Sequence, residues 1–216
     1  MKTRILYSFK RCPYAMRARM ALLLANIQCE IREVSLDNKP KHMLEISPKG
    51  TVPVLILEDQ IIDESMNIVN WAITESKLFI NNISRDQIEI TESIINTFDN
   101  NFKYHLDRYK YSTRYKNINK EFHKFECLNI ILDIEKIIGK ERWFFGNELN
   151  KLDITILPFL RQFKIADPNW FESLTKIPKT QKLLNNFLDS RLFLDIMRKY
   201  DFWNELSNKQ LLIKNN

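Results

Sequence analysis

The sequence predicts an α/β domain followed by an all-α domain, and three observations support this division. The first ~75 residues alternate strand and helix patterns in the order βαβ, a short helix, then ββα. A polar stretch rich in serine and asparagine follows, and beyond it the apolar residues recur with helical spacing only. We therefore expect an α/β domain at 1–76, a linker at 77–88 and an all-helical domain at 89–216. A chain of 216 residues can form two small cores.

The elements of the α/β domain follow from short runs of strand or helix periodicity. Strands are expected at 4–8, 29–36, 54–57 and 60–63, and helices at 13–26, 42–46 and 66–75. The last two strands flank Glu58-Asp59, which indicates a hairpin although its turn contains no glycine. The stretch from Pro48 to Pro53 is read as a loop.

The second domain is built from helical patterns alone. They predict helices at 88–109, 120–138, 152–165, 178–188 and 191–199. Asn150 and Asp153 are spaced as a helix N-cap and its reciprocal partner, so they indicate a folding device and not a catalytic pair. Pro158 lies inside the third of these helices and implies a kink or a break there.

Composition and charge exclude several classes of protein. Hydrophobic residues make up 44% of the chain, yet no apolar run approaches the roughly 20 residues that a membrane span needs. The first residues lead into a strand and not into the apolar core of a signal peptide, so we expect a cytoplasmic protein. The net charge of +6 favours anionic ligands. The basic residues are scattered, without a basic-aromatic run, which argues against nucleic acid as a partner.

The cysteines and histidines show neither disulfide nor metal-site spacing. They are Cys12, Cys29 and Cys127, with His42, His105 and His123. No Cys-x-x-Cys pair exists, because Ala15 stands where the second cysteine would be. Cys29 lies in a predicted strand and Cys127 on the inward face of a predicted helix, so both are interpreted as core residues. We expect no metal.

Cys12 is the candidate nucleophile. It lies where a predicted strand meets the start of a predicted helix, next to the helix N–H groups and the positive end of the helix dipole. That position favours the thiolate, which is the reactive form of cysteine. Pro13 suits the first helical turn, and Lys10 and Arg11 could attract an anionic ligand. The alternative is an ordinary buried cysteine.

Four features in order resemble the glutathione S-transferase superfamily. They are the Cys12-Pro-Tyr-Ala15 start, the Thr51-Val-Pro53 loop before a hairpin, Glu64-Ser65 at the next helix, and the helical second half. The first half is similar to the thioredoxin-like glutathione-binding domain of that superfamily. The Cys-Pro-aromatic start and Leu36-Asp-Asn-Lys-Pro40 resemble its cysteine-type, omega-like branch. The segments Leu152–Phe163 and Asp167–Phe171 are similar to the second domain of bacterial members.

The resemblance implies roles for five residues of the first domain. Cys12 matches the catalytic cysteine. Val52 matches the residue whose backbone pairs with the cysteinyl part of glutathione, and Pro53 matches the cis-proline that follows it. Glu64 and Ser65 match the pair that holds the γ-glutamyl group. This fits their chemistry, since a carboxylate can bind the ligand's ammonium while a serine at a helix N-terminus can bind its carboxylate.

The resemblance also implies further contacts and an oligomeric state. Lys39 matches a basic residue near the glycyl carboxylate of glutathione. Tyr104 and Tyr111 lie where the superfamily keeps its second-substrate pocket. Relatives are mostly homodimers, so a homodimer is expected. The partners implied are glutathione and an unidentified small electrophile or glutathionylated thiol.

The function implied is a glutathione-dependent thiol transferase or reductase, with dehydroascorbate reduction among its candidate reactions. Because Ala15 removes a resolving thiol, Cys12 would act alone and hold glutathione as a mixed disulfide. One alternative is conjugation of glutathione to electrophiles through the hydroxyl of Ser8 or Tyr7. Another is a non-catalytic binding module that resembles the stringent-starvation regulators.

Overall fold

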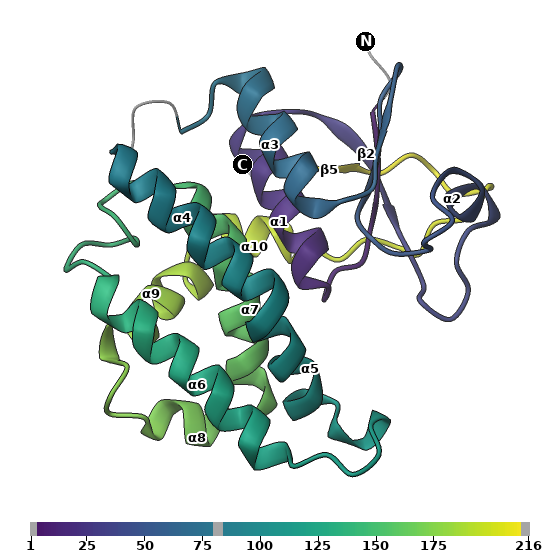
Figure 1. Cartoon of the computed structure of the whole chain (residues 1–216). Helices are drawn as coiled ribbons and strands as arrows, with labels where there is room; N and C mark the ends of the chain where they lie inside the picture. Colours follow the sequence, from purple (N-terminus) through teal and green to yellow (C-terminus); the bar gives the residue numbers. More distant parts are fainter. Residues whose placement is uncertain (1–3, 80–83, 213–216) are drawn as a thin grey trace. The chain divides into compact units, whose positions relative to one another are not determined.

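The chain divides into two compact units. The computed structural model describes residues 4–79 and 84–212. Unit 1 comprises the described residues of Met1–Leu78 and Ser190–Asn216, and unit 2 those of Phe79–Asp189 (Figure 1). Within the described residues, no helix combines the length and the apolar character needed to cross a membrane.

Unit 1 is built on a mixed sheet. Its described strands are β1 (Ile5–Ser8), β2 (Cys29–Glu33), β3 (Val54–Ile56), β4 (Ile61–Ile62) and β5 (Leu211–Leu212), in the spatial order β4-β3-β1-β2-β5. β1 and β2 are parallel, as expected for strands joined by a helical crossover, and the other pairs are antiparallel. In this register Tyr7 on β1 lies between Arg32 on β2 and Val54 on β3.

The helices of unit 1 cover both faces of the sheet. They are α1 (Pro13–Leu24), α2 (Lys41–Ile46), α3 (Ser65–Ser76) and α10 (Arg191–Ile196). Figure 1 shows α1 and α3 packed together on one face of the sheet and α2 on the other. Residues from Ala15 to Leu23 are all buried, so α1 is the central helix of the unit. The predicted strands and helices of the first 76 residues are all confirmed, and β2 ends three residues earlier than expected, at Glu33.

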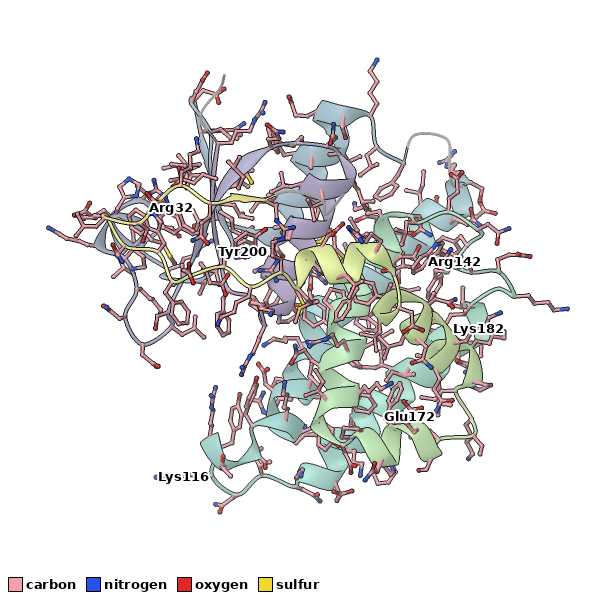
Figure 2. All side chains as sticks on the ribbon, turned by 180° about the vertical axis from the view of Figure 1, so that it is seen from behind. Arg32, Lys116, Arg142, Glu172, Lys182 and Tyr200 are labelled. Carbon is pink, nitrogen blue, oxygen red and sulfur yellow. The ribbon has the colours of Figure 1, made fainter. Side chains whose placement is uncertain are left out.

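The C-terminal segment departs from the sequence prediction. Residues 89–216 were expected to form one all-helical domain, but the segment after Ser190 belongs to unit 1. Leu211–Leu212 extends the sheet by pairing with β2, and the N–H of Trp203 donates to the carbonyl of Glu33 over 2.9 Å. This tail, residues 197–212, includes Tyr200, which is labelled in Figure 2 together with Arg32 of β2. A two-residue strand is too short to produce a periodic pattern, so the sequence could not indicate it.

The predicted linker at 77–88 is also shorter in the structure. Helix α4 (Arg85–Thr97) begins inside it, because Ser84 and Gln87 form a capping box around the first turn. At the other end, Lys77 adopts a left-handed conformation that ends α3. Residues 80–83 of the predicted linker lie outside the described residues.

Unit 2 consists of helices around an aromatic core. After α4 come the π-helical turn Phe98–Phe102, α5 (Lys103–Lys110), the 3₁₀ turn Ser112–Arg114, α6 (Lys120–Ile137), α7 (Lys151–Ala166), α8 (Pro168–Ser173) and α9 (Pro178–Leu188). The core includes Phe102 and Phe163, whose ring centroids lie 6.0 Å apart. The expected Asn150–Asp153 capping box is confirmed. Pro158 does not break α7, and the short helix α8 was not predicted.

Candidate active site around Cys12

Cys12 occupies the N-cap position of α1. Its backbone is extended, with φ −73° and ψ 122°, and Pro13 follows as the first helical residue. The Cys12 N–H donates to the carbonyl of Phe9 over 3.0 Å, and the Cys12 carbonyl accepts from the N–H of Met16 over 2.9 Å. The side chain is half-buried. The thiol therefore lies at the positive end of α1, as the sequence predicts.

The loop before β3 brings a backbone carbonyl next to this thiol. Cys12 Sγ lies 3.6 Å from the carbonyl oxygen of Val52 and donates a hydrogen bond to it. The expected cis peptide bond between Val52 and Pro53 is present. Two residues that are forty positions apart in the chain are thus joined at the end of the sheet where β1 ends and β3 begins.

Gly50 allows this loop to fold close to the segment before α2. Its φ is +61°, a left-handed conformation that favours glycine, and its N–H donates to the carbonyl of Ser47 over 2.9 Å. A Cβ atom at Gly50 would stand 3.1 Å from Leu44 Cδ2 and 3.6 Å from Lys39 Nζ. The ammonium group of Lys39 therefore lies beside Gly50, in the loop that carries Val52.

Glu64 and Ser65 begin α3. Glu64 is the N-cap residue and Ser65, which is 5% exposed, is the first helical residue. The Glu64 carboxylate forms an ion pair of 2.6 Å with Lys49 Nζ, and Lys49 lies 3.4 Å from Asp63 Oδ1. The hydrogen bond with Glu64, together with the nearby Asp63, raises the pKa of Lys49.

Lys49 and Asp63 were not among the predicted site residues. Asp63 also accepts a hydrogen bond of 3.1 Å from Ser47 Oγ, so it fastens the start of α3 to the loop at two points. The available signal was position alone: Lys49 lies inside the predicted loop and Asp63 directly precedes Glu64. Charge pairing between segments this far apart in sequence leaves no local pattern.

The two hydroxyl groups considered as alternatives to Cys12 are engaged elsewhere. Tyr7 and Ser8 are both 0% exposed. Tyr7 Oη lies 2.9 Å from His42 Nδ1 and accepts from the guanidinium of Arg32 over 2.8 Å, and burial raises the pKa of the phenol. Ser8 Oγ accepts from Arg19 over 2.7 Å. Both hydroxyl groups are therefore buried and hydrogen-bonded within the protein.

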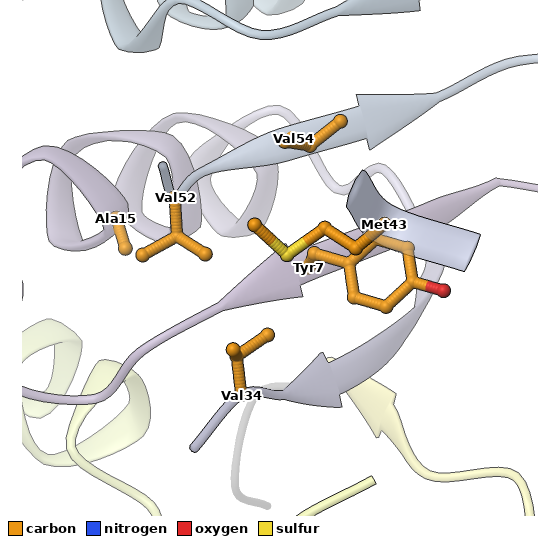
Figure 3. Close-up of a cluster of buried hydrophobic side chains, with 6 residues drawn as sticks. All are labelled: Tyr7, Ala15, Val34, Met43, Val52 and Val54. Carbon is orange, nitrogen blue, oxygen red and sulfur yellow. The ribbon is translucent and has the colours of Figure 1, made fainter. Parts of the chain in front are cut away.

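A hydrophobic cluster of buried side chains lies next to Cys12. Its members are Tyr7, Ala15, Val34, Met43, Val52 and Val54. Figure 3 shows these side chains converging from β1, α1, α2, β3 and the segments after β2 and before β3, with the Tyr7 hydroxyl pointing away from Ala15 and Val52. Cys12 and Trp203 pack against the same cluster. The loop that carries Val52 and the start of α1 therefore pack against the same hydrophobic cluster.

The other cysteines are core residues, as predicted. Cys29 is 3% exposed and Cys127 is 0% exposed. Burial raises the pKa of both thiols, that of Cys29 to about 12. None of the three cysteines forms a disulfide in the structure. Cys12 is therefore the cysteine whose position suits nucleophilic chemistry.

Tyr104 and Tyr111 lie in and just after α5 of unit 2, and both rings are partly exposed. Arg108 stands over the Tyr104 ring at 3.4 Å and Arg114 over the Tyr111 ring at 4.4 Å. Their role in binding a second substrate remains a prediction. Across residues 4–79 and 84–212, no group of three or more His, Cys, Asp or Glu side chains is arranged to hold a metal ion.

Comparisons with known proteins point to one family. Residues 6–77 match the family model described as "Glutathione S-transferase, N-terminal domain". The chain is 25% identical over 218 residues to glutathione S-transferase omega-1 of Rattus norvegicus, covering 90% of this chain and 84% of that one. It is 27% identical over 212 residues to the probable glutathione S-transferase MSR-1 of Nicotiana plumbaginifolia, covering 95% of each.

Solved structures share the fold of most of the chain. A glutathione transferase family member from Pseudomonas fluorescens pf-5, with two glutathiones bound, matches with a TM-score of 0.77 at 17% identity, covering 90% of this chain and 92% of that one. Glutathione transferase Omega 3C from Trametes versicolor matches with a TM-score of 0.75 at 16% identity, covering 92% and 85%.

Proposed function

The chain belongs to the glutathione S-transferase superfamily, and on that premise we propose that it is a cysteine-type, omega-like thiol transferase that acts through Cys12. The observation that carries the proposal is the 3.6 Å contact between Cys12 Sγ and the Val52 carbonyl oxygen. A glutathione that pairs with the backbone of Val52 would present its sulfur to the Cys12 thiol. The similarity to glutathione S-transferase omega-1 of Rattus norvegicus supports the same assignment.

The reaction needs one cysteine and two glutathiones. The Cys12 thiolate attacks the glutathione sulfur of a glutathionylated substrate. A disulfide forms between Cys12 and glutathione, and the substrate leaves as a thiolate that takes up a proton. The thiolate of a second glutathione then attacks the glutathionyl sulfur, which releases oxidised glutathione and restores the Cys12 thiolate. Ala15 supplies no second thiol, so this monothiol route fits the sequence.

The remaining residues are proposed to bind the tripeptide. Glu64 takes the ammonium group of the γ-glutamyl unit, and Ser65 with the first turn of α3 takes its carboxylate. Lys39, held beside Gly50, takes the glycyl carboxylate. In the structure Lys49 forms ion pairs with both Glu64 and Asp63. When the ammonium group of the ligand binds Glu64, Lys49 keeps its ion pair with Asp63.

Two other functions considered for this chain fit the observed site less well. Conjugation through Ser8 or Tyr7 would need a hydroxyl that faces the ligand, and both are buried and hydrogen-bonded. A non-catalytic module like the stringent-starvation regulators has no need of a cysteine at the start of α1. We also propose that the second substrate is a small electrophile or a glutathionylated thiol, and that the protein is a cytoplasmic homodimer. Size-exclusion chromatography with light scattering would measure the oligomeric state.

Intact-mass analysis after incubation with oxidised glutathione tests the proposed function. We expect one glutathionyl adduct on the native protein, mapped to Cys12 by peptide digestion, and none on Cys12→Ala. Titration calorimetry should show that Cys12→Ala still binds reduced glutathione. An adduct elsewhere, or full thiol-transferase activity in Cys12→Ala, would exclude the mechanism. Absence of glutathione binding in the native protein would favour the non-catalytic module.

A further inference from the structure

The main chain of Lys10, two residues before Cys12, is hydrogen-bonded at both its N–H and its carbonyl by buried ionic side chains. Glu33 Oε1 on β2 accepts from the Lys10 N–H over 2.6 Å. The guanidinium of Arg19 on α1 donates to the Lys10 carbonyl over 2.7 Å and, through its other terminal nitrogen, to Ser8 Oγ over 2.7 Å. We call Arg19 and Glu33 the clamp.

The clamp residues are almost fully buried. Arg19 is 1% exposed and Glu33 is 4% exposed. Within the described residues, Arg19 Nε and Glu33 Oε2 have no hydrogen-bond partner. Burying charged groups is costly unless they are paired, and apolar residues would stabilise this position more simply. Folding alone therefore gives a weak reason for two ionic residues here.

The clamp fixes the turn that presents the nucleophile. The Cys12 N–H donates to the carbonyl of Phe9 over 3.0 Å, so the turn from Ser8 to Cys12 is closed by hydrogen bonds at Ser8, Phe9 and Lys10. The direction of the Cys12 side chain toward Val52 depends on this turn. A shift of the Lys10 main chain would move the Cys12 thiol relative to the Val52 carbonyl oxygen.

The clamp also places two opposite charges at the turn that carries the thiol. Burial lowers the pKa of Arg19 to about 10, while Glu33 and Cys12 act in the other direction, so Arg19 is a cation at neutral pH that interacts with Cys12. Burial raises the pKa of Glu33, opposed by the Lys10 N–H and by Arg19. The charged or titratable groups on β1, the turn, α1 and β2 are Tyr7, Lys10, Arg11, Cys12, Tyr14, Arg17, Arg19, Cys29, Glu30, Arg32 and Glu33. In the tail, Tyr200, which is labelled in Figure 2, also interacts with Arg19.

We propose that Arg19 and Glu33 are positioning residues that set both the orientation and the ionisation of the Cys12 thiol. Arg19 favours the thiolate, and Glu33 opposes it while holding the turn in place. The balance of the two charges fixes the pH at which Cys12 becomes reactive. This inference rests on the proposed role of Cys12 as the nucleophile, but its test needs no glutathione.

The pH dependence of Cys12 alkylation by iodoacetamide tests the proposal. The thiolate displaces iodide and forms a thioether, so the rate follows the fraction of thiolate. Removing the cation in Arg19→Met should move the midpoint up by about one pH unit, since an opposite charge nearby favours an ionised group. Removing the anion in Glu33→Gln, which keeps an acceptor for the Lys10 N–H, should move it down. A merely structural role cannot produce shifts of opposite sign.

The controls separate charge from packing. Arg19→Lys keeps the cation and should restore the native midpoint. Arg4→Met removes an equal charge beside the other end of β1 and should leave the midpoint unchanged. Cys12→Ala should take up no label, since Cys29 and Cys127 are buried.

Shifts of the same sign in Arg19→Met and Glu33→Gln, or no shift in either, would overturn the clamp. If Arg19→Met does not fold, Glu33→Gln decides: a lower midpoint supports the clamp, and an unchanged or higher one overturns it. An unchanged midpoint in these variants alongside a normal glutathione adduct on the native protein would reject the clamp and keep the proposed function.

Discussion

The indole ring of Trp203 stands edge-on against the ring of Tyr7, with centroids 5.8 Å apart and an interplanar angle of 89°. The guanidinium of Arg32 lies 4.2 Å from the centroid of the same indole and donates to the Tyr7 hydroxyl. The tail is thereby attached to the central strand β1, and through Tyr7 to His42 on α2. A segment far along the chain completes the base of the candidate site.

Trp203→Ala should therefore destabilise unit 1. Truncating a packed aromatic side chain typically costs about 3–5 kcal/mol, and because Trp203 is only half-buried we expect about 2 kcal/mol. The measurement is the midpoint of thermal unfolding. Phe202→Ala is the matched control, because Phe202 precedes Trp203 in the chain and is 59% exposed. Its loss should change the unfolding free energy by less than about 0.5 kcal/mol. Equal effects of the two substitutions would show that the tail's ring contacts do not stabilise the sheet.

Glu64→Gln should weaken glutathione binding. The substitution keeps the size of the side chain and removes the charge that is proposed to bind the ligand's ammonium. A hydrogen bond between charged groups contributes about 1.5–3 kcal/mol, so titration calorimetry should show a loss of affinity of about tenfold or more. Glu58→Gln removes an equal charge from the exposed β3–β4 turn and should bind as the native protein does. A native affinity in Glu64→Gln would remove Glu64 from the proposed glutathione site.

The sequence predicts the parts of this site that are local. The strand–helix junction at Cys12, the loop that ends at Pro53 and the helix start at Glu64-Ser65 each have a pattern within a few residues. The cis peptide bond at Pro53 was expected from the resemblance to a family and not from the pattern itself. The hairpin without glycine was also found, because its two apolar runs are clear.

The parts that were missed depend on pairing between distant segments. The ion pair of Lys49 with Glu64 and the contacts of Arg19 and Glu33 with Lys10 bring together residues from separate elements. β5 contains two residues whose partner, β2, is far away in the sequence. Apolar periodicity records which face of an element is buried, and it carries no information on which distant element covers that face.

His105 and His123 in unit 2 should make the chain sensitive to acid. Their Nδ1 atoms lie 2.8 Å apart, a geometry that needs one protonated and one unprotonated nitrogen. Burial lowers the pKa of both imidazoles, and His105 further lowers that of His123. Below a pH of about 6.5 the unfolded chain binds more protons than the folded one, so stability is lost as pH falls.

The comparison of native protein with His123→Asn measures this effect. Asparagine can still hydrogen-bond to His105 but does not titrate. Between pH 7 and pH 5 the midpoint of thermal unfolding of the native protein should drop by about 2–4 °C relative to that of His123→Asn, which corresponds to roughly 1 kcal/mol for a chain of this size. Parallel curves for the two proteins would mean that the histidine pair accepts a second proton without strain.

Asp153 should give unit 2 the opposite dependence on pH. Its carboxyl group is 0% exposed, and burial raises its pKa to about 7 although the N–H groups of Phe144 and Asn150 donate to it. An unfolded aspartate has a pKa of about 3.9, so between these values the folded chain keeps a proton that the unfolded chain has released. The unfolding free energy therefore falls as pH rises from about 4 to about 7, by at most about 4 kcal/mol.

In Asp153→Asn this pH-dependent part of the unfolding free energy disappears. The difference in thermal unfolding midpoint between the native protein and the variant should therefore narrow as pH rises from about 4 to about 7. Asparagine also has a single acceptor oxygen in place of two, so the variant should be less stable at pH 4. A difference that stays constant from pH 4 to pH 7 would mean that the two N–H donors keep the carboxyl ionised despite its burial.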